Sequence, residues 1–387
     1  MLKAIKIRIC PSREQEIYIS KLLGSCRFVY NNLLSYKIEK YNIDKHNVTF
    51  KELNKKLTEL KTIEEFIWLK ESHSKVLQQS MINLDLAYKS FFKNGTGFPK
   101  FKSRKNNKQS CRFPVDAIGN LKGNKITIIK DLKNIHFKCS KTDEKYLNKN
   151  QNSIRSGTLT KTKSGNYYFS ILIDKPNTKI LSKSDKIVGI DLGIKDFIVC
   201  SNGNKFENIK IIRNNEDKLS KLHRNLSRKT GIKNKEKSRI KLAKFNEKLN
   251  NIKENYLHLV TNKLLDENQV IVMEDLNVLG MMKNHNLARS IQELSLNRFK
   301  TILEYKANWY NRDVIQVDRF FPSSKLCSSC GFKNDKLELK DREWICPKCG
   351  KNNDRDFNAS LNIEREGIRI LQIGSSSPKL TPLEKIN

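Results

Sequence analysis

The sequence has no uninterrupted run of 18 or more apolar residues, and its acidic residues are few compared with its basic ones. The missing apolar run excludes an ordinary transmembrane helix. The first ten residues alternate between charged and apolar side chains, unlike the continuous apolar core of a secretory signal. An internal repeat of about 20–50 residues is also absent, which excludes solenoid folds.

The deficit of acids is large. The 387 residues include 41 Asp and Glu against 75 Lys and Arg, a formal net charge of +34. A long polyanion exploits such an excess, because every neutralised phosphate releases counterions. The charge therefore indicates nucleic-acid binding, although a protein with basic solvated faces would have the same composition. The 18 Phe, 11 Tyr and 3 Trp supply packed cores and exclude a wholly disordered chain.

Two segments concentrate the positive charge. Residues 93–112 hold seven Lys or Arg and no acid, interleaved with Phe98 and Phe101. This predicts a loop that contacts nucleic acid, with a flexible solvated linker as the alternative. Residues 218–248 hold 12 Lys or Arg against two Glu, on a predicted helical pair broken near Gly231. The second helix has an apolar stripe predicted to be buried: Phe245, Leu249, Ile252, Tyr256, Leu259 and Leu264.

Hydrophobic periodicity divides the chain into regions of different type. Residues 3–9 alternate as a half-buried strand, and residues 13–92 follow a helical pattern. Short alternating runs over 113–173 predict a small β-barrel or meander, which the N-terminal strand could complete. From residue 187 onwards, short apolar strands alternate with helices, one of them predicted over 290–310. This last region is predicted to be α/β.

Four of the nine cysteines follow the pattern C-x2-C-x15-C-x2-C, at Cys327, Cys330, Cys346 and Cys349. Two such knuckles bring four thiolates into the tetrahedron that Zn²⁺ favours, with Zn–S distances of about 2.3 Å. The four ligands close the site, so the zinc is expected to be structural. The other cysteines are scattered, and a reduced intracellular protein fits this distribution better than a disulfide scaffold.

Three carboxylates are candidate catalytic residues. Asp191 and Glu274 each end an apolar strand, and Asp356 lies at the opening of a helix. A charged group at the end of a buried strand is costly unless a cation compensates it. Sharing one pocket, the three acids would hold two Mg²⁺ ions about 3.5–4 Å apart for phosphodiester hydrolysis. Taken singly, Glu274 could cap a helix and Asp356 could interact with a helix dipole.

These residues resemble the TnpB family, the OrfB products of insertion sequences and relatives of compact type V CRISPR effectors. The resemblance covers about residues 3–370. It rests on the runs Val188–Gly193, Val272–Leu276 and Asp354–Ala359, on Trp309–Arg312 and Phe321–Lys325, on the zinc knuckles, and on the N-terminal echoes Cys10–Ser12, Glu14–Gln15, Arg27–Asn31 and Phe98–Lys102.

The resemblance implies a split RuvC-like RNase H fold with an inserted zinc ribbon. It assigns residues 1–12 and 112–185 to a wedge β-barrel, 13–111 to a helical recognition subdomain, 186–322 and 353–372 to the nuclease, 323–352 to the zinc ribbon and 373–387 to a disordered tail. It also implies that Asp191, Glu274 and Asp356 hold two catalytic Mg²⁺ ions, for which Mn²⁺ could substitute.

The implied partners are a guide RNA from the transposon end and double-stranded DNA beside a short motif. The expected state is a monomeric ribonucleoprotein in the bacterial cytoplasm, associated with the nucleoid. Expected nucleic-acid contacts are Lys75, Gln78, Gln79, Lys100, Lys102, Arg104, Gln109, Arg224 and Arg228. Gln pairs bidentately with adenine, although ordinary exposed polar positions would look the same.

Three alternatives to an RNA-guided endonuclease remain at this point. A strand-transfer transposase could use the same acids without RNA, although no Tyr or Ser nucleophile motif of a recombinase is present. A guided DNA-binding repressor would not cut, but the three intact acids argue against it. A compact CRISPR effector would be encoded beside a repeat array instead of within a transposon.

Overall fold

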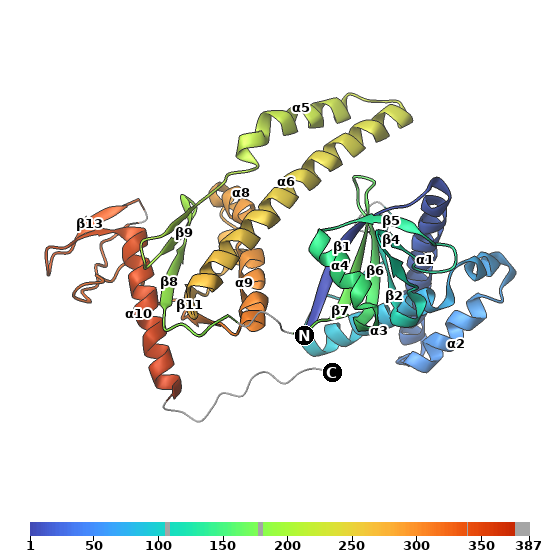
Figure 1. The fold of residues 1–387 in the computed structure, drawn as a ribbon, viewed down its shortest axis with the longest axis horizontal. Coiled ribbons are helices and arrows are strands. Elements are labelled where there is room, and N and C mark those ends of the chain that lie inside the picture. The colour runs from blue at the N-terminus through green and yellow to red at the C-terminus, as the bar shows by residue number, and fades with distance from the viewer. Residues whose placement is uncertain (105–108, 177–180, 339, 376–387) are drawn as a thin grey trace. The chain divides into compact units, whose positions relative to one another are not determined.

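The computed structural model describes residues 1–104, 109–176, 181–338 and 340–375 (Figure 1). The chain forms two compact units, residues 1–176 with 229–244 and residues 177–228 with 245–387. Residues 376–387, most of the tail expected to be disordered, lie outside the described residues. The preceding three residues, 373–375, instead end the helix α10 (Arg355–Ser375).

The first unit contains a seven-stranded antiparallel sheet in the order β2-β6-β7-β1-β5-β4-β3. Strand β1 lies inside the sheet, and its residues Ile5, Ile7 and Ile9 are buried, as their alternation predicts. In the region of short alternating runs over 113–173, β3 and β4 are only two residues long. The bounds are β1 (Leu2–Cys10), β2 (Gln109–Pro114), β3 (Leu121–Lys122), β4 (Lys125–Ile126), β5 (Ile135–Lys138), β6 (Ile154–Lys161) and β7 (Tyr167–Asp174).

Helices pack with this sheet around one hydrophobic core. The long helix α1 begins with a capping box, in which the Ser12 side chain accepts from the Gln15 N–H and the Gln15 side chain accepts from the Ser12 N–H. The helical recognition subdomain expected over 13–111 also includes the first three residues of β2, which begins at Gln109. The helices are α1 (Arg13–Asp44), α2 (Phe50–Leu60), α3 (Ser74–Asn94) and α4 (Lys141–Lys149), with 3-10 turns η1 (Glu64–Glu71), η2 (Val115–Ala117) and η3 (Gln151–Ser153).

The second unit is built on a five-stranded mixed sheet in the order β10-β9-β8-β11-β12. Strands β8, β11 and β12 are parallel, whereas β9 and β10 are antiparallel to their neighbours. The bounds are β8 (Ile187–Leu192), β9 (Asp196–Cys200), β10 (Lys205–Glu207), β11 (Val270–Glu274) and β12 (Asp313–Val317), with a separate ribbon of β13 (Glu343–Ile345) and β14 (Asn352–Asp354).

The helices of this region confirm the predicted pair broken near Gly231, but the single helix expected over 290–310 is wrong. Two helices, α8 and α9, are separated there by Ser295, whose φ of 54° lies in the left-handed region. The bounds are η4 (Arg213–Asn215), α5 (Glu216–Ser227), α6 (Ile232–Glu267), α7 (Val278–Met281), α8 (His285–Leu294) and α9 (Leu296–Tyr310).

Helix α10 lies against the five-stranded sheet, on β8, β9, β11 and β12 (Figure 1). Two glycines permit the close approach. A Cβ on Gly189 of β8 would lie 2.2 Å from the Ser360 carbonyl oxygen, and one on Gly367 of α10 would lie 2.3 Å from the Val272 side chain. The helix that carries Asp356 is therefore held directly on the strand that carries Asp191.

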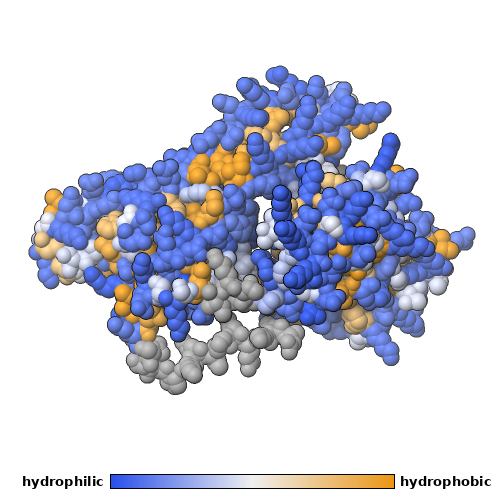
Figure 2. Space-filling view, in the orientation of Figure 1, coloured by the Kyte–Doolittle hydropathy of each residue, from blue (hydrophilic) through white to orange (hydrophobic). Residues whose placement is uncertain are grey.

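On the face that Figure 2 shows, hydrophilic residues dominate and apolar residues form scattered patches. Among the described residues, every helix is too short or too polar to cross a membrane. The combination of α/β, all-β and helical parts confirms the expected mixed fold class.

Candidate metal centres and nucleic-acid interface

Asp191 and Glu274 lie at the same edge of the five-stranded sheet. Strands β8 and β11 run parallel, with Met273 opposite Ile190. Each acid is the next residue on its strand, so the register places the two side by side. Both are half-buried. The parallel pairing of two distant strands thus brings together two of the acids that were selected from the sequence.

Asp356 reaches these acids from the first turn of α10. The Asp354 side chain accepts a hydrogen bond of 2.9 Å from the Phe357 N–H and thereby caps this helix. Burial raises the pKa of Asp191 to about 8, and the negative charges of Glu274 and Asp356 add to the increase. Burial also raises the pKa of Glu274. The Asp191 carboxylate therefore lies within electrostatic reach of the other two acids, and a divalent cation relieves such repulsion.

Two further residues contact these acids. The Ser323 hydroxyl donates a hydrogen bond to Oε1 of Glu274, and the Arg342 guanidinium forms an ion pair with Asp356 at 3.3 Å. Ser323 belongs to the Phe321–Lys325 run that carried the family resemblance, so its sequence context marked it without assigning a role. Arg342 is one of 75 Lys and Arg residues, and nothing in the sequence distinguished it from the others.

The donor chemistry of the acid site fits Mg²⁺, a hard cation that takes carboxylate oxygens and retains water. The three acids are not gathered as closely as ligands around one ion. Across the described residues, only the four zinc-knuckle cysteines form a group of three or more His, Cys, Asp or Glu whose ligand atoms all lie within 4.8 Å. The acid site therefore has the right ligands in a more open arrangement.

The cysteine cluster has the dimensions of a tetrahedral zinc site. Its Sγ atoms are 3.7 Å apart for Cys327 and Cys349, and 3.6 Å apart for Cys330 and Cys346. Four sulfurs at about 2.3 Å from a central zinc would be separated by about 3.8 Å, so the match is close. Gly331 and Gly350 have φ values of 72° and 71° and turn the backbone after each pair. The predicted set of four cysteines is thus brought together.

Hydrogen bonds connect the first zinc knuckle to α10. The buried Asn358 side chain accepts from the Ser328 N–H at 2.8 Å and donates to the Leu326 carbonyl at 2.6 Å. One turn later, Asn362 donates to the carbonyls of Ser323 and Leu326, both at 2.7 Å. The knuckle therefore positions the same helix that presents Asp356, and also the loop that presents Ser323.

The structure spreads the predicted nucleic-acid contacts over several elements. Lys75 and Gln78 are exposed at the start of α3, where Lys75 forms an ion pair with Asp116, and Gln79 is half-buried. Exposed Lys100 and Lys102 follow α3, and Lys102 has its Nζ 3.8 Å from the centre of the Tyr30 ring. Arg224 and Arg228 are exposed on and just after α5. Arg224 and Arg228 belong to the second unit and the other positions to the first. Residues 105–108 of the basic segment lie outside the described residues.

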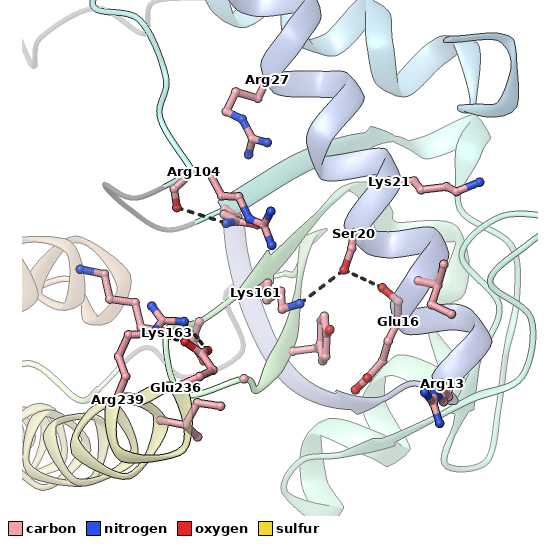
Figure 3. A pocket seen from close by; sticks show the side chains of 16 residues that line it. Arg13, Glu16, Ser20, Lys21, Arg27, Arg104, Lys161, Lys163, Glu236 and Arg239 are labelled. Atoms are coloured by element: carbon pink, nitrogen blue, oxygen red, sulfur yellow. Dashed lines mark hydrogen bonds and ion pairs between the residues drawn. The ribbon is translucent and has the colours of Figure 1, made fainter. Parts of the chain in front are cut away.

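Arg104 and Gln109 instead belong to a basic hollow of the first unit (Figure 3). To this hollow α1 contributes Arg13, Lys21 and Arg27, and the β6–β7 hairpin contributes Lys161 and Lys163. We refer to these residues as the basic hollow. Its five members beyond Arg104 and Gln109 were not predicted, because the α1 members and the hairpin members are more than a hundred residues apart in sequence.

Comparison with protein families gives three matches along the chain. Residues 1–46 match a model described as a helix-turn-helix domain of OrfB proteins. Residues 170–285 match a model described as "probable transposase", and residues 297–363 match the TNB domain of Cas12f1-like proteins.

Two relatives match nearly the whole chain. A Streptomyces pristinaespiralis protein named as an RNA-guided DNA endonuclease is 33% identical over 95% of this chain and 89% of its own length. An Escherichia coli (strain K12) protein named as the RNA-guided DNA endonuclease InsQ is 29% identical over 99% of this chain and 97% of its own.

Two solved structures share the fold. One is the Cas12f1–sgRNA–target DNA complex, with a TM-score of 0.56, 15% identity and coverage of 94% of this chain and 98% of the other. The second is the mini-RNA-guided endonuclease CRISPR-Cas_phi3, with a TM-score of 0.53, 12% identity and coverage of 94% and 92%.

Proposed function

The chain belongs to the TnpB family of insertion-sequence proteins, and from this premise we propose that it is an RNA-guided DNA endonuclease. It would bind a guide RNA made from the end of its own element and cleave double-stranded DNA next to a short motif. The observation that carries the proposal is that Asp191 and Glu274 are neighbours at one end of the sheet and that the negative charge of Asp356 acts on Asp191. A monomeric ribonucleoprotein in the bacterial cytoplasm, near the nucleoid, completes the proposal.

The second unit would be the RuvC-like nuclease, and the seven-stranded sheet the wedge. Asp191, Glu274 and Asp356 would hold two Mg²⁺ ions, which when bound would activate a water molecule and stabilise the leaving 3′ oxygen. Ser323 supports this role by fixing one oxygen of Glu274. Arg342 supplies positive charge to Asp356. The cysteine cluster would hold one structural zinc.

The charge distribution supports the two nucleic-acid partners. An RNA and its heteroduplex are held through backbone and shape, while base pairing carries the sequence. A net charge of +34 spread over several elements fits this mode of binding, because contacts to the RNA backbone do not have to be base-specific. We therefore expect most Lys and Arg to contact phosphates of the RNA.

The decisive experiment is cleavage by the protein purified with its co-expressed RNA. Matched and mismatched targets, each flanked by a library of adjacent motifs, are incubated with Mg²⁺. The matched target should be cut next to one motif, and the mismatched target should not. Asp191→Ala should abolish cleavage, by at least about 1,000-fold, and leave target binding intact. Absence of cleavage of the matched target across the whole library would overturn the proposal.

A strand-transfer transposase is the second candidate, favoured by the description of the family model that matches residues 170–285. It would join DNA ends and would need no RNA. Treating the protein with ribonuclease before it meets the target separates the two activities. End joining that survives the treatment supports the transposase, whereas cleavage that is lost with the RNA supports the endonuclease.

A further inference from the structure

A second hollow adjoins the basic hollow on helix α1, and its chemistry is different. It has a volume of about 550 Å³ and lies between α1 and η1. Its charges are balanced, since Lys21 and Arg27 face Glu14 and Glu71, and Lys21 pairs with Glu71 at 2.9 Å. Ile17, Lys21 and Arg27 line both hollows. One ridge of α1 therefore separates a basic surface from an electrically balanced one.

Two exposed apolar side chains form walls of this second hollow. Ile17 on α1 is 55% exposed and Trp68 on η1 is 38% exposed. Phe28 supports the indole of Trp68, with ring centroids 5.2 Å apart at an interplanar angle of 64°. The indole is thus held in place while part of it faces the hollow. A planar ligand can stack on a fixed aromatic side chain without first ordering it.

Gly24 lines the α1 side of the second hollow and places no side chain in it. A Cβ built on Gly24 would meet only the Arg27 side chain, at 4.0 Å, so packing does not require glycine there. Glycine in the middle of a helix costs about 1 kcal/mol relative to alanine. An open space above a helical glycine, opposite an exposed indole, has the form of a slot for a flat group.

We propose that this slot, which we call the Trp68 slot, binds an unpaired nucleobase whose phosphates lie in the basic hollow. A base is planar and uncharged, which matches a balanced apolar slot. The phosphates on either side of it are anionic, which matches Arg13, Arg27, Arg104 and Lys161 next to it. In a continuous strand, a sugar links the base to its neighbouring phosphates. The ridge of α1 that is shared by the two hollows would lie beneath that sugar. The proposal rests on the proposed function, because it requires the chain to bind a nucleic acid.

The test compares two single-stranded RNA probes of the same charge, oligoadenylate of about ten nucleotides and an abasic ribose-phosphate strand of the same length. Binding to the full chain is measured by fluorescence anisotropy. Trp68→Ala should weaken oligoadenylate binding about fivefold or more, because stacking on an aromatic ring is lost, and should leave abasic binding unchanged. Trp68→Phe should restore most of the loss. Lys161→Gln, a change in the basic hollow, should weaken both probes equally.

Gly24→Leu fills the slot from the wall opposite Trp68, so it tests the slot without changing the indole. It should also weaken oligoadenylate selectively, even if Trp68→Ala alters folding, which circular dichroism would reveal. The same probes are then made as DNA. The nucleic acid whose binding the slot variants weaken more is the one that places its base in the slot. Equal weakening of both probes by the slot variants, or none, overturns the slot while leaving the proposed function intact. If neither probe binds the wild type at low salt, the nucleic-acid function itself has failed.

Discussion

At the scale of single residues, the acid site is strained without a metal, and Asp191 shows this most strongly. The folded protein raises its pKa from 3.8 to about 8. Between these values the folded state keeps a proton that the unfolded chain has released. The free energy of unfolding of the metal-free protein therefore falls as pH rises through this window. The raised pKa of Glu274 acts in the same direction.

Asp191→Asn should consequently stabilise the metal-free protein, because asparagine has no charge to bury. We expect its melting temperature in EDTA to exceed that of the wild type by about 4 °C or more near pH 8. The difference should shrink towards about pH 5, since the wild-type carboxyl is then protonated. With excess Mg²⁺ the order should reverse. Thermal unfolding across this pH range tests both signs, and a variant less stable than the wild type in EDTA at pH 8 would contradict the account.

Single residues also differ in how far the sequence predicts their roles. Asp191 and Glu274 could be selected as candidate catalytic residues because a charged side chain at the end of a buried strand is costly unless a cation compensates it. Asp356 and the four cysteines were visible through local motifs. Ser323 and Arg342 could not be assigned roles, since each depends on a contact with a residue 49 or 14 positions away that only the folded chain creates. Spacing predicts ligands that share a motif, but it does not predict their hydrogen-bond partners.

At the scale of elements, the distance between α10 and β8 determines the geometry of the acid site. Gly189→Ala would place a methyl group against the α10 backbone, 2.2 Å from the Ser360 oxygen and 2.4 Å from the Glu364 nitrogen. The helix must move away, which should cost roughly 1–3 kcal/mol of stability. Because α10 carries Asp356, a shift of about 1 Å should lower cleavage about 100-fold.

Gly231→Ala is the matched control for this change. A Cβ there meets nothing within 4 Å, and its backbone does not require glycine. Denaturant unfolding and cleavage rates should therefore be close to wild type for Gly231→Ala and clearly reduced for Gly189→Ala. Unchanged cleavage by Gly189→Ala would show that the α10–β8 distance does not position Asp356.

Hydrophobic periodicity predicted the helix α6 but not all of the residues that it buries. The existence of α6 followed from its pattern, but its predicted buried stripe was partly wrong. Leu259 is 58% exposed and Ile252 is 44% exposed, whereas Leu257 and Val260 are buried. A 36-residue helix packs against different neighbours along its length, so no single stripe applies to all of it. The break at Ser295 was missed because no Gly or Pro marks it.

At the scale of the whole molecule, the net charge of +34 predicted a polyanion partner but not where it binds. The basic hollow assembles Arg13, Arg27, Arg104 and Lys161 from α1, the segment before β2 and β6. These elements meet only because β1 and α1 pack with strands far along the chain. Composition thus indicates the class of partner, and the long-range packing creates the surface that could receive it.

The division into two units makes a further prediction about zinc. The knuckles belong to the second unit and hydrogen-bond to α10 through Asn358 and Asn362. The seven-stranded sheet of the first unit has its own hydrophobic core. Removing zinc with a strong chelator should therefore raise hydrogen exchange in residues 323–352 and in the first turns of α10, because structural zinc supplies on the order of 10 kcal/mol of folding energy.

Exchange in β1, β6 and β7 should stay unchanged in the same experiment, which hydrogen-exchange mass spectrometry resolves peptide by peptide. Cys346→Ser should reproduce the pattern without chelator, whereas Cys139→Ser, at a cysteine outside the cluster, should not. Cleavage should fall with the loss of protection in α10, since Asp356 is then no longer held near Asp191. Exchange that rises equally in both units would mean that they unfold as one cooperative body, and that zinc stabilises the whole chain instead of the second unit alone.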